Sequence, residues 1–375
     1  MRILFCCNTL HGFCNFRLDV VEHLVRKGNE AVIVYPYKED DELILQTLPE
    51  GSRAIPCKMS PNGKSLTQDT GYFLRLLKIL RKERPDLVIN YTVKPNIFGG
   101  IAAKISGVPS VAMAPGLGYV FTKKGALGWF LRKIYIYGLR FAEFVLTLNS
   151  SDQEQLVANG LKKERIILLK GGEGVNLKRF PYSEGVYEKP RFLMISRLLY
   201  DKGYREFVNA ASKIKAIYPD TRFEIAGTLN EQNPAGVPHC ILFEDERAGR
   251  IKYIGYVEKI VKELADPNTV VVLPSYYREG MNRSLMEACS CGRPIITTCL
   301  PGLKELVIDG VNGFLVEPKS TDSLLNGINS FMKLPLEKRV EMGRISRELA
   351  EKRFSVQNVM IVYDRIIEQI FSRNV

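Results

Sequence analysis

The chain has few histidines, a single tryptophan and no long apolar run. Its 375 residues include three histidines, which are well separated at positions 11, 23 and 239. Because a zinc site needs three or four ligands held close together, such a site is not expected. No apolar run approaches the ~20 residues that span a bilayer, and the first residues resemble a strand rather than a signal peptide. We therefore expect a cytoplasmic protein.

The eight cysteines form no recognisable metal or disulfide pattern. None are spaced C-x-x-C, and most lie in apolar segments typical of strands or helices. Free buried cysteines are usual in reducing compartments. We interpret them as reduced core residues: Cys6, Cys7, Cys14, Cys57, Cys240, Cys289, Cys291 and Cys299.

The net charge of +12 is concentrated in the first half of the chain. Residues 1–185 contain 26 Lys and Arg against 17 Asp and Glu, whereas residues 186–375 contain 27 against 24. No recognised nucleic-acid module is present, so nucleic acid is not an expected partner. Two segments, 72–82 and 121–135, place basic residues beside bulky apolar ones. We interpret the first as a helix packed on a sheet, and predict that the second, which contains Trp129, contacts anionic lipid headgroups.

Short apolar runs alternate with amphipathic segments throughout the chain, which predicts an α/β protein with parallel sheets covered by helices. The linker between the halves is expected at 171–190, where Gly and Pro interrupt the periodicity. Strands are expected at 2–7, 30–35, 54–57, 87–90, 110–113, 144–148, 166–169, 192–195, 222–226, 251–254, 270–273 and 294–297. Helices of the first half are expected at 16–27, 70–83, 96–106, 126–141 and 151–159, the last capped by Ser151 with Glu154 at capping-box spacing, and 354–371 forms a final amphipathic stretch.

Two carboxylates, Glu279 and Glu287, lie eight positions apart where an apolar strand gives way to a helix. If the segment is helical, they are about 12 Å apart along one face, comparable to the reach of a nucleoside-diphosphate sugar from ribose to hexose. Unsatisfied amides at the helix N-terminus favour phosphate; those expected between the two acids belong to Asn282, Arg283 and Ser284. The alternative is that one acid complements the helix dipole and the other is a solvated mid-helix Glu.

A second strand-to-helix loop contains the cations Arg197 and Lys202, followed by Gly203. Two cations five residues apart can both reach one diphosphate, and they neutralise charge that develops on a leaving nucleotide. Together with the paired carboxylates, this loop favours a nucleotide-sugar site.

The Arg-x4-Lys-Gly loop, the Glu-x7-Glu segment and residues 174–180 resemble the signature of the retaining GT-B glycosyltransferases of family 4. The resemblance covers nearly the whole chain. It implies two Rossmann-like domains whose parallel sheets face each other across a cleft. Residues 1–180, with a C-terminal crossover helix at 354–375, are expected to bind the acceptor, and residues 190–353 the nucleotide sugar.

The resemblance also implies a role for each site residue. Arg197 and Lys202 hold the diphosphate, Glu287 binds the ribose hydroxyls and Glu279 contacts the donor hexose. The rest of the donor site is expected at Gly280, Met281, Asn282, Arg283, Ser284, Tyr256 and Val257, although Tyr256 can equally be an ordinary loop aromatic. The acceptor site is expected at His11, Gly12, Asn15, Arg17, Lys94, Gly116, Leu117 and Gly118.

The chain departs from the family pattern at one of these acceptor positions. Many relatives carry Gly-Gly where this chain has His11-Gly12. Arg17, expected at the start of a helix, either grips an acceptor diphosphate or is a helix-surface arginine.

No Asp-x-Asp follows an expected strand, and Glu244-Asp245-Glu246 lies in a polar insert. A metal bridging the diphosphate therefore lacks ligands, and we expect transfer without a metal or other cofactor. The resemblance implies that retention follows the family's front-face mechanism, in which the leaving diphosphate takes the acceptor proton.

Within the family, residues 94–99, 116–118 and the segment after Phe121 resemble enzymes that extend polyprenyl-diphosphate-linked sugars in bacterial glycan assembly. The likeness implies a UDP-sugar donor, and UDP-GalNAc is the donor that it favours. It also implies a peripheral protein on the cytoplasmic face of the inner membrane. UDP-GlcNAc, UDP-galactose and UDP-glucose remain alternatives as donors. A nucleotide-sugar 2-epimerase, a transferase with a soluble acceptor, and a non-catalytic nucleotide- or nucleic-acid-binding protein are the alternative functions.

Overall fold

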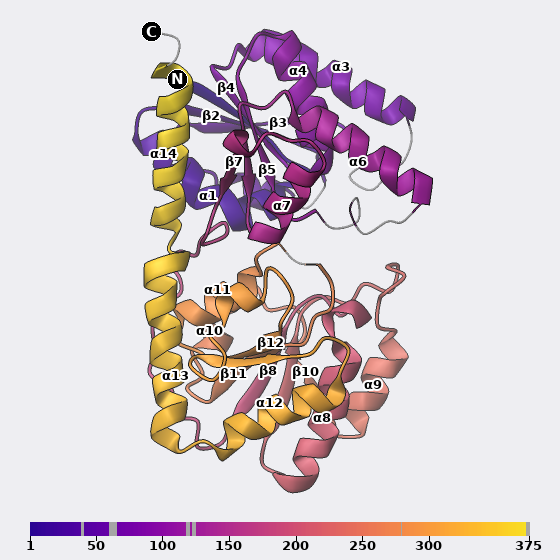
Figure 1. The fold of residues 1–375 in the computed structure, drawn as a ribbon, viewed down its shortest axis with the longest axis vertical. Coiled ribbons are helices and arrows are strands. Elements are labelled where there is room, and N and C mark those ends of the chain that lie inside the picture. The colour runs from indigo at the N-terminus through magenta and orange to yellow at the C-terminus, as the bar shows by residue number, and fades with distance from the viewer. Residues whose placement is uncertain (39–40, 60–65, 118–120, 122–124, 279, 373–375) are drawn as a thin grey trace. The chain divides into compact units, whose positions relative to one another are not determined.

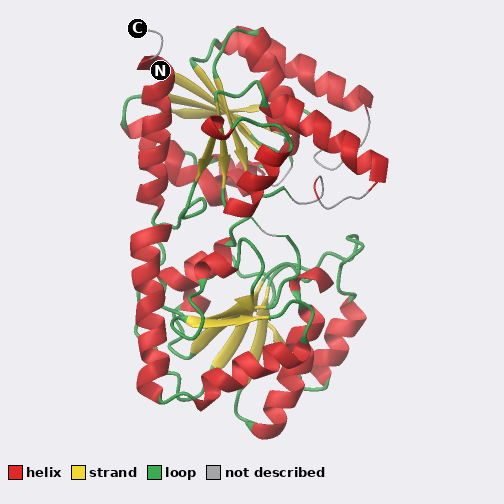
Figure 2. Cartoon of the chain, viewed as in Figure 1, coloured by secondary structure: helices red, strands yellow, loops and turns green. Residues whose placement is uncertain are grey.

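The computed structural model describes residues 1–375 except 39–40, 60–65, 118–120, 122–124, 279 and 373–375. The chain divides into two units, residues 1–173 with 356–375, and residues 174–355. Figure 2 shows that each unit has a central sheet with helices packed around it. Every strand pair within the two sheets is parallel. The predicted α/β class is therefore confirmed.

The sheet of the first unit, drawn in indigo to magenta in Figure 1, has the strand order β3-β2-β1-β4-β5-β6-β7. The strand numbers fall toward β1 and rise from β4, so the order of the strands reverses between these two parallel neighbours. Its strands are β1 (Arg2–Cys6), β2 (Glu30–Tyr35), β3 (Ser52–Pro56), β4 (Leu87–Tyr91), β5 (Ser110–Ala114), β6 (Phe144–Thr147) and β7 (Ile166–Leu168). Its helices are α1 (Leu10–Arg26), α2 (Asp41–Leu45), α3 (Leu66–Glu83), a π-helix (Pro95–Gly99), α4 (Gly100–Ile105), α6 (Gly125–Leu139), α7 (Ser150–Ala158) and α14 (Val356–Ser372). Ligands bind such sheets beyond the carboxyl ends of the strands, near this reversal.

The second unit has the strand order β10-β9-β8-β11-β12-β13. Its strands are β8 (Arg191–Ile195), β9 (Arg222–Ala226), β10 (Lys252–Tyr253), β11 (Thr269–Leu273), β12 (Ile295–Thr298) and β13 (Gly313–Val316). Its helices are α8 (Tyr204–Ile217), α9 (His239–Arg247), α10 (Val261–Leu264), α11 (Arg283–Ser290), α12 (Thr321–Lys333), α13 (Leu336–Leu349) and a π-helix (Ala350–Phe354). The edge strand β13 was not among the predicted strands.

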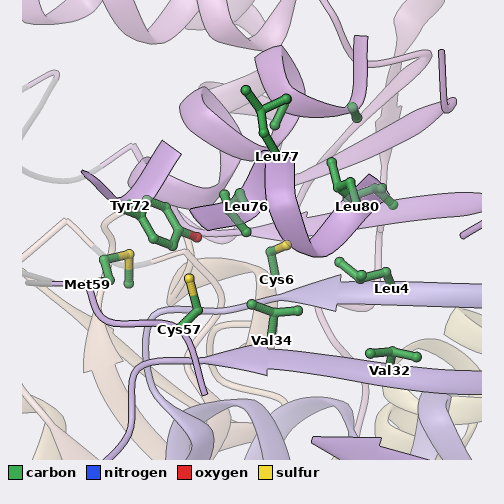
Figure 3. Packing of buried hydrophobic residues seen from close by; sticks show 13 residues of the cluster. Leu4, Cys6, Val32, Val34, Cys57, Met59, Tyr72, Leu76, Leu77 and Leu80 are labelled. Carbon is green, nitrogen blue, oxygen red and sulfur yellow. The ribbon is translucent and has the colours of Figure 1, made fainter. Parts of the chain in front are cut away.

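The core of the first unit is built from alternate residues of its strands. Leu4 and Cys6 of β1 lie under α3, whose Leu76 and Leu80 pack over them in Figure 3. The residue between them, Phe5, faces the other side of the sheet, where its ring lies 5.7 Å from that of Phe13 in α1. Period-two alternation thus explains why both faces of this sheet are buried.

Six of the eight cysteines are buried and all are free. Burial raises the pKa of the Cys289 thiol to about 12, so that it stays protonated at neutral pH. The prediction of reduced core cysteines is confirmed for these six, but Cys240 is exposed and Cys299 is half-buried.

The predicted cap of α7 is wrong. The helix begins at Ser150, and the side chain of Asn149 accepts a hydrogen bond of 2.8 Å from the amide of Asp152. Asn149 is extended, with φ −145°, as an N-cap residue must be, whereas Ser151 already lies in the first turn. Among the described helices, none is both long enough and apolar enough to cross a membrane.

Candidate nucleotide-sugar site

Helix α11 starts later than the sequence suggested. Its N-cap is Asn282, whose side-chain oxygen accepts a hydrogen bond of 3.0 Å from the amide of Leu285. The amide of Asn282 itself donates to the carbonyl of Gly302 at 3.2 Å. The 12 Å estimate assumed a continuous helix from Glu279, and that assumption is wrong because α11 begins only at Arg283. The amide of Asn282 is engaged by Gly302 and is not one of the unsatisfied amides that were expected there. Glu279 lies outside the described residues.

Glu287 is a half-buried carboxylate on α11. It accepts a hydrogen bond of 2.9 Å from Nε of Arg283, one turn earlier, and the two side chains are only 13% and 10% exposed. Nη1 of Arg283 also donates to the carbonyl of Gly174. Burial raises the pKa of the Glu287 carboxyl, and the positive charges of Arg283 and Arg179 offset this only in part. A desolvated, oriented carboxylate of this kind suits the hydroxyls of a sugar better than a solvated one.

The loop after β8 is joined directly to the loop after β11. The carbonyl of Asp201 accepts hydrogen bonds from the amides of Tyr276 at 2.9 Å and Tyr277 at 3.0 Å. Gly203 has φ +85°, and a Cβ there would lie 2.3 Å from the carbonyl oxygen of Pro274. Only glycine allows this approach. The two loops can therefore pack against each other because Gly203 has no side chain.

The two cations of the first loop differ in setting. Lys202 is buried, and its Nζ lies 4.7 Å from the centre of the Tyr277 ring. Arg197 is exposed, and the loop on its C-terminal side is held by the amide of Leu198, which donates to Thr228 at 3.0 Å. Lys202 is thus oriented by an aromatic ring at the segment that leads into α11, whereas Arg197 is exposed at the same edge of the sheet.

The loops after β9 and β10 lie at that edge too. Gly227 donates to the carbonyl of Gly255 at 2.9 Å, and a Cβ on Gly227 would lie 1.7 Å from the carbonyl oxygen of Ser196. Tyr256 is 58% exposed and Val257 is half-buried. The exposed ring of Tyr256 is therefore available to stack on a base.

Of the remaining predicted donor residues, Met281 is buried and the others are half-buried: Gly280, Asn282, Arg283 and Ser284.

In the first unit, helix α1 begins at Leu10 and not at residue 16. Thr9 caps it by accepting a hydrogen bond of 3.1 Å from the amide of Gly12. His11 is therefore an exposed residue of the first turn, where the side-chain nitrogen of Asn15 lies 3.1 Å from its ring.

Arg17 consequently lies well inside α1 and is buried, so the interpretation as a helix-surface arginine was wrong, whereas a contact with an acceptor diphosphate stays a prediction. Its side chain forms an ion pair of 2.5 Å with Glu173, and both side chains are 8% exposed. The guanidinium also lies 4.3 Å from the centre of the Tyr91 ring. The charge of Arg17 is thus balanced within the unit by Glu173, the last residue before the chain passes to the second unit.

Lys94 follows β4 but is already paired. Its Nζ lies 2.5 Å from Oδ1 of Asp69 in α3. The turn before it is strained, because Thr92 has φ +74°, which is rare for a branched side chain, and a π-helix follows at Pro95–Gly99. Such irregularities gather at functional sites.

Gly116 is half-buried, Leu117 is buried and Gly118 lies outside the described residues. Sequence reasoning missed Asp69, Glu173 and Tyr277 as partners of the predicted cations. It could have found the Arg283–Glu287 pair from its i, i+4 spacing. In the described part of the chain, no three His, Cys, Asp or Glu side chains are grouped closely enough to hold a metal ion.

Two family models match the two units in turn. The model of the Glycosyl transferases group 1 matches residues 180–349, and that of Glycosyltransferase Family 4 matches residues 16–172. The chain is a family 4 glycosyltransferase. This is a retaining family of enzymes that use nucleotide-sugar donors.

Relatives of this glycosyltransferase extend the picture. Over 99% of the chain and 100% of the relative, it is 26% identical to the N,N'-diacetylbacillosaminyl-diphospho-undecaprenol alpha-1,3-N-acetylgalactosaminyltransferase of Campylobacter jejuni. Over 70% of each chain, it is 28% identical to the UDP-Gal:alpha-D-GlcNAc-diphosphoundecaprenol alpha-1,3-galactosyltransferase of Escherichia coli. The crystal structure of Anabaena HepE in complex with UDP and glucose superposes with a TM-score of 0.80 at 21% identity, over 99% of this chain and 100% of that one. The predicted GT-B fold is confirmed.

Proposed function

We propose that this glycosyltransferase moves a hexose or N-acetylhexosamine, best GalNAc, from a UDP-sugar to a polyprenyl-diphosphate-linked saccharide. The reaction proceeds with retention and without a metal. The second unit binds the nucleotide sugar and the first unit binds the acceptor. Both curated relatives named above act, by their names, on undecaprenol-diphosphate-linked sugars, which supports this acceptor class.

The observation that carries the donor assignment is the junction between the Lys202 loop and the segment leading into α11. The hydrogen bonds from Tyr276 and Tyr277 to Asp201 fix a cation next to the loop that precedes the Glu287 helix. A UDP-sugar needs positive charge for its diphosphate and carboxylates for its hydroxyls. One edge of the sheet therefore offers both.

In the proposed reaction the bond between the anomeric carbon and the diphosphate oxygen breaks, and the negative charge passes to UDP. Arg197 and Lys202 stabilise that charge, as preorganised cations do for a developing oxyanion. The acceptor hydroxyl attacks from the face that UDP leaves, and its proton passes to the departing phosphate oxygen. Glu287 binds the ribose hydroxyls and Glu279 contacts the hexose.

The test compares Lys202→Ala with Lys319→Ala. Lys319 lies in the same unit and also sits over a tyrosine ring, with its Nζ 4.8 Å from the centre of that of Tyr276. We expect Lys202→Ala to lower kcat/KM for transfer from UDP-GalNAc to a synthetic prenyl-diphosphate disaccharide by about 100-fold or more, and Lys319→Ala to change it little. Equal kcat/KM in the two variants would show that Lys202 does not take part in donor binding or catalysis. An epimerised UDP-sugar formed without acceptor would instead identify a 2-epimerase.

A further inference from the structure

Helix α6 has two apolar faces, of which its own unit covers only one. The inner face packs into the core around β5 and β6, through Gly128, Tyr135, Ile136, Gly138 and Leu139. A soluble helix normally turns a polar face outward, and a helix that is apolar all round is buried or meets a membrane. The outer face of α6, on the side away from the sheet in Figure 1, is therefore expected to bind a partner.

The outer face carries a continuous stripe of large side chains. Leu127, Phe130, Ile134 and Tyr137 follow one another at spacings of three, four and three residues, which places them along one side of a helix. They are 53%, 55%, 36% and 57% exposed, and Trp129 beside them is 57% exposed. Single exposed apolar residues are ordinary, but a contiguous patch marks an interaction surface.

The segment of the chain that contains this stripe carries charge of one sign. Residues 87–142 contain seven Lys and Arg and no Asp or Glu. On α6 itself, the ammonium of Lys133 lies 5.7 Å from the centre of the Trp129 ring. A cation beside an aromatic ring that borders an apolar stripe matches the layering of a bilayer surface, in which anionic phosphates lie above acyl chains.

A second copy of the chain fits this face less well. A two-fold dimer would bring the α6 face of each copy against its own counterpart. Lys133 would then approach its equivalent in the other copy, and α6 itself has no carboxylate to pair with it. An anionic lipid surface supplies the opposite charge, and tryptophan and tyrosine are enriched where proteins meet lipid headgroups.

We propose that the outer face of α6 docks on an anionic phospholipid bilayer. Leu127, Phe130 and Ile134 enter the headgroup region, and Lys133 lies at the level of the phosphates. The inference rests on the proposed function only in that a lipid-linked acceptor gives this docking its purpose. Docking itself is measured without donor or acceptor.

The chain carries its own reporter, because Trp129 is its single tryptophan. With the full-length protein at low salt, vesicles of phosphatidylcholine and phosphatidylglycerol should shift the tryptophan emission to shorter wavelength. Brominated lipid should quench it, and pure phosphatidylcholine should have a much smaller effect. Unchanged emission and no co-sedimentation with the anionic vesicles would overturn the inference.

Two double variants provide the matched comparison. Phe130→Ser with Ile134→Ser removes half of the stripe, whereas Ile217→Ser with Phe243→Ser removes side chains that are 61% and 57% exposed in the second unit. The first double variant should weaken vesicle binding by about tenfold or more, because each apolar side chain buried in the bilayer adds to the free energy of binding. The second should leave vesicle binding unchanged. Lys133→Glu should weaken binding by up to about fivefold per unit of charge changed, an effect that high salt removes.

The outcomes separate this inference from the proposed function. Vesicle binding that depends on the stripe, with no transfer to a lipid-linked acceptor, would leave the inference standing and refute the function. Transfer to the acceptor by a protein that ignores vesicles would do the reverse. A concentration-dependent dimer in sedimentation velocity, abolished by Phe130→Ser with Ile134→Ser and accompanied by no vesicle binding, would assign the face to a second copy.

Discussion

Replacing Glu287 by glutamine should weaken donor binding while leaving the fold intact. The carboxylate is held by Nε of Arg283 at 2.9 Å and is 13% exposed, so it is oriented and shielded from water before the donor arrives. A hydrogen bond to a charged group contributes about 1.5–3 kcal/mol. Losing one such bond to the ribose corresponds to a rise in donor KM of roughly 10- to 150-fold. Because the ribose contact is the same in ground and transition states, kcat should change little.

The pH dependence gives a second reading of the same residue. The folded protein raises the pKa of Glu287, chiefly through burial. The contribution of this carboxyl to stability is therefore full below its unfolded pKa and is lost as pH rises through the folded pKa. At neutral pH the charge disfavours folding, so Glu287→Gln should not lower the melting temperature. In the wild type, donor KM should rise as pH falls through the raised pKa, and the variant should lack this dependence.

Steady-state kinetics with varied UDP-sugar, together with calorimetry, measures both effects. The control is Glu224→Gln, because Glu224 is also a shielded partner of an arginine in the second unit, 2.5 Å from Arg191. We expect unchanged donor KM in that variant. The reasoning about Glu287 is refuted if both variants have wild-type KM, or if Glu287→Gln lowers kcat alone.

Three further predictions concern other parts of the chain. Activity should survive excess chelator, while Arg197→Ala should lower kcat/KM by about 100-fold; strict dependence on Mg²⁺ or Mn²⁺ would show that the cations do not replace a metal. Tyr277→Leu should raise the donor KM because the contact between the ring and Lys202 is lost. Tyr277→Phe should leave the donor KM unchanged because the ring face remains. An equal donor KM in the two variants would exclude this positioning role. Arg17→Met leaves the charge of Glu173 uncompensated and should lower the free energy of unfolding by about 3–5 kcal/mol, measured by scanning calorimetry; an unchanged unfolding transition would contradict the importance of this pair.

The sheets were predictable because buried parallel strands are continuous apolar runs. The bounds predicted for β2 and β9 agree with those of the structure, Glu30–Tyr35 and Arg222–Ala226. The strand β13 was missed because it is short, only its end residues are buried, and it follows a turn-rich segment. Helix starts were less predictable. The run Asn149-Ser150-Ser151 offers three residues able to cap α7, and the sequence does not rank them.

The sequence was enough to predict which residue types form the candidate site. It was not enough to predict which side chains these residues contact. Local partners are encoded by spacing, as for Arg283 and Glu287. Lys94 and Asp69 are 25 residues apart and meet only because α3 packs beside the end of β4. No sequence pattern predicts such an ion pair, because it depends on tertiary packing. For the same reason α6 could be recognised as basic and aromatic, but its outward stripe required the structure.

The most direct test of the central claim is a donor screen against a synthetic prenyl-diphosphate-linked disaccharide, measuring UDP release and the anomeric configuration of the product. We expect UDP release to require both donor and acceptor, to be fastest with UDP-GalNAc among the UDP-sugars, and to yield the retained anomer. No acceptor-dependent UDP release with any UDP-sugar, or a product of inverted configuration, would contradict the proposed reaction.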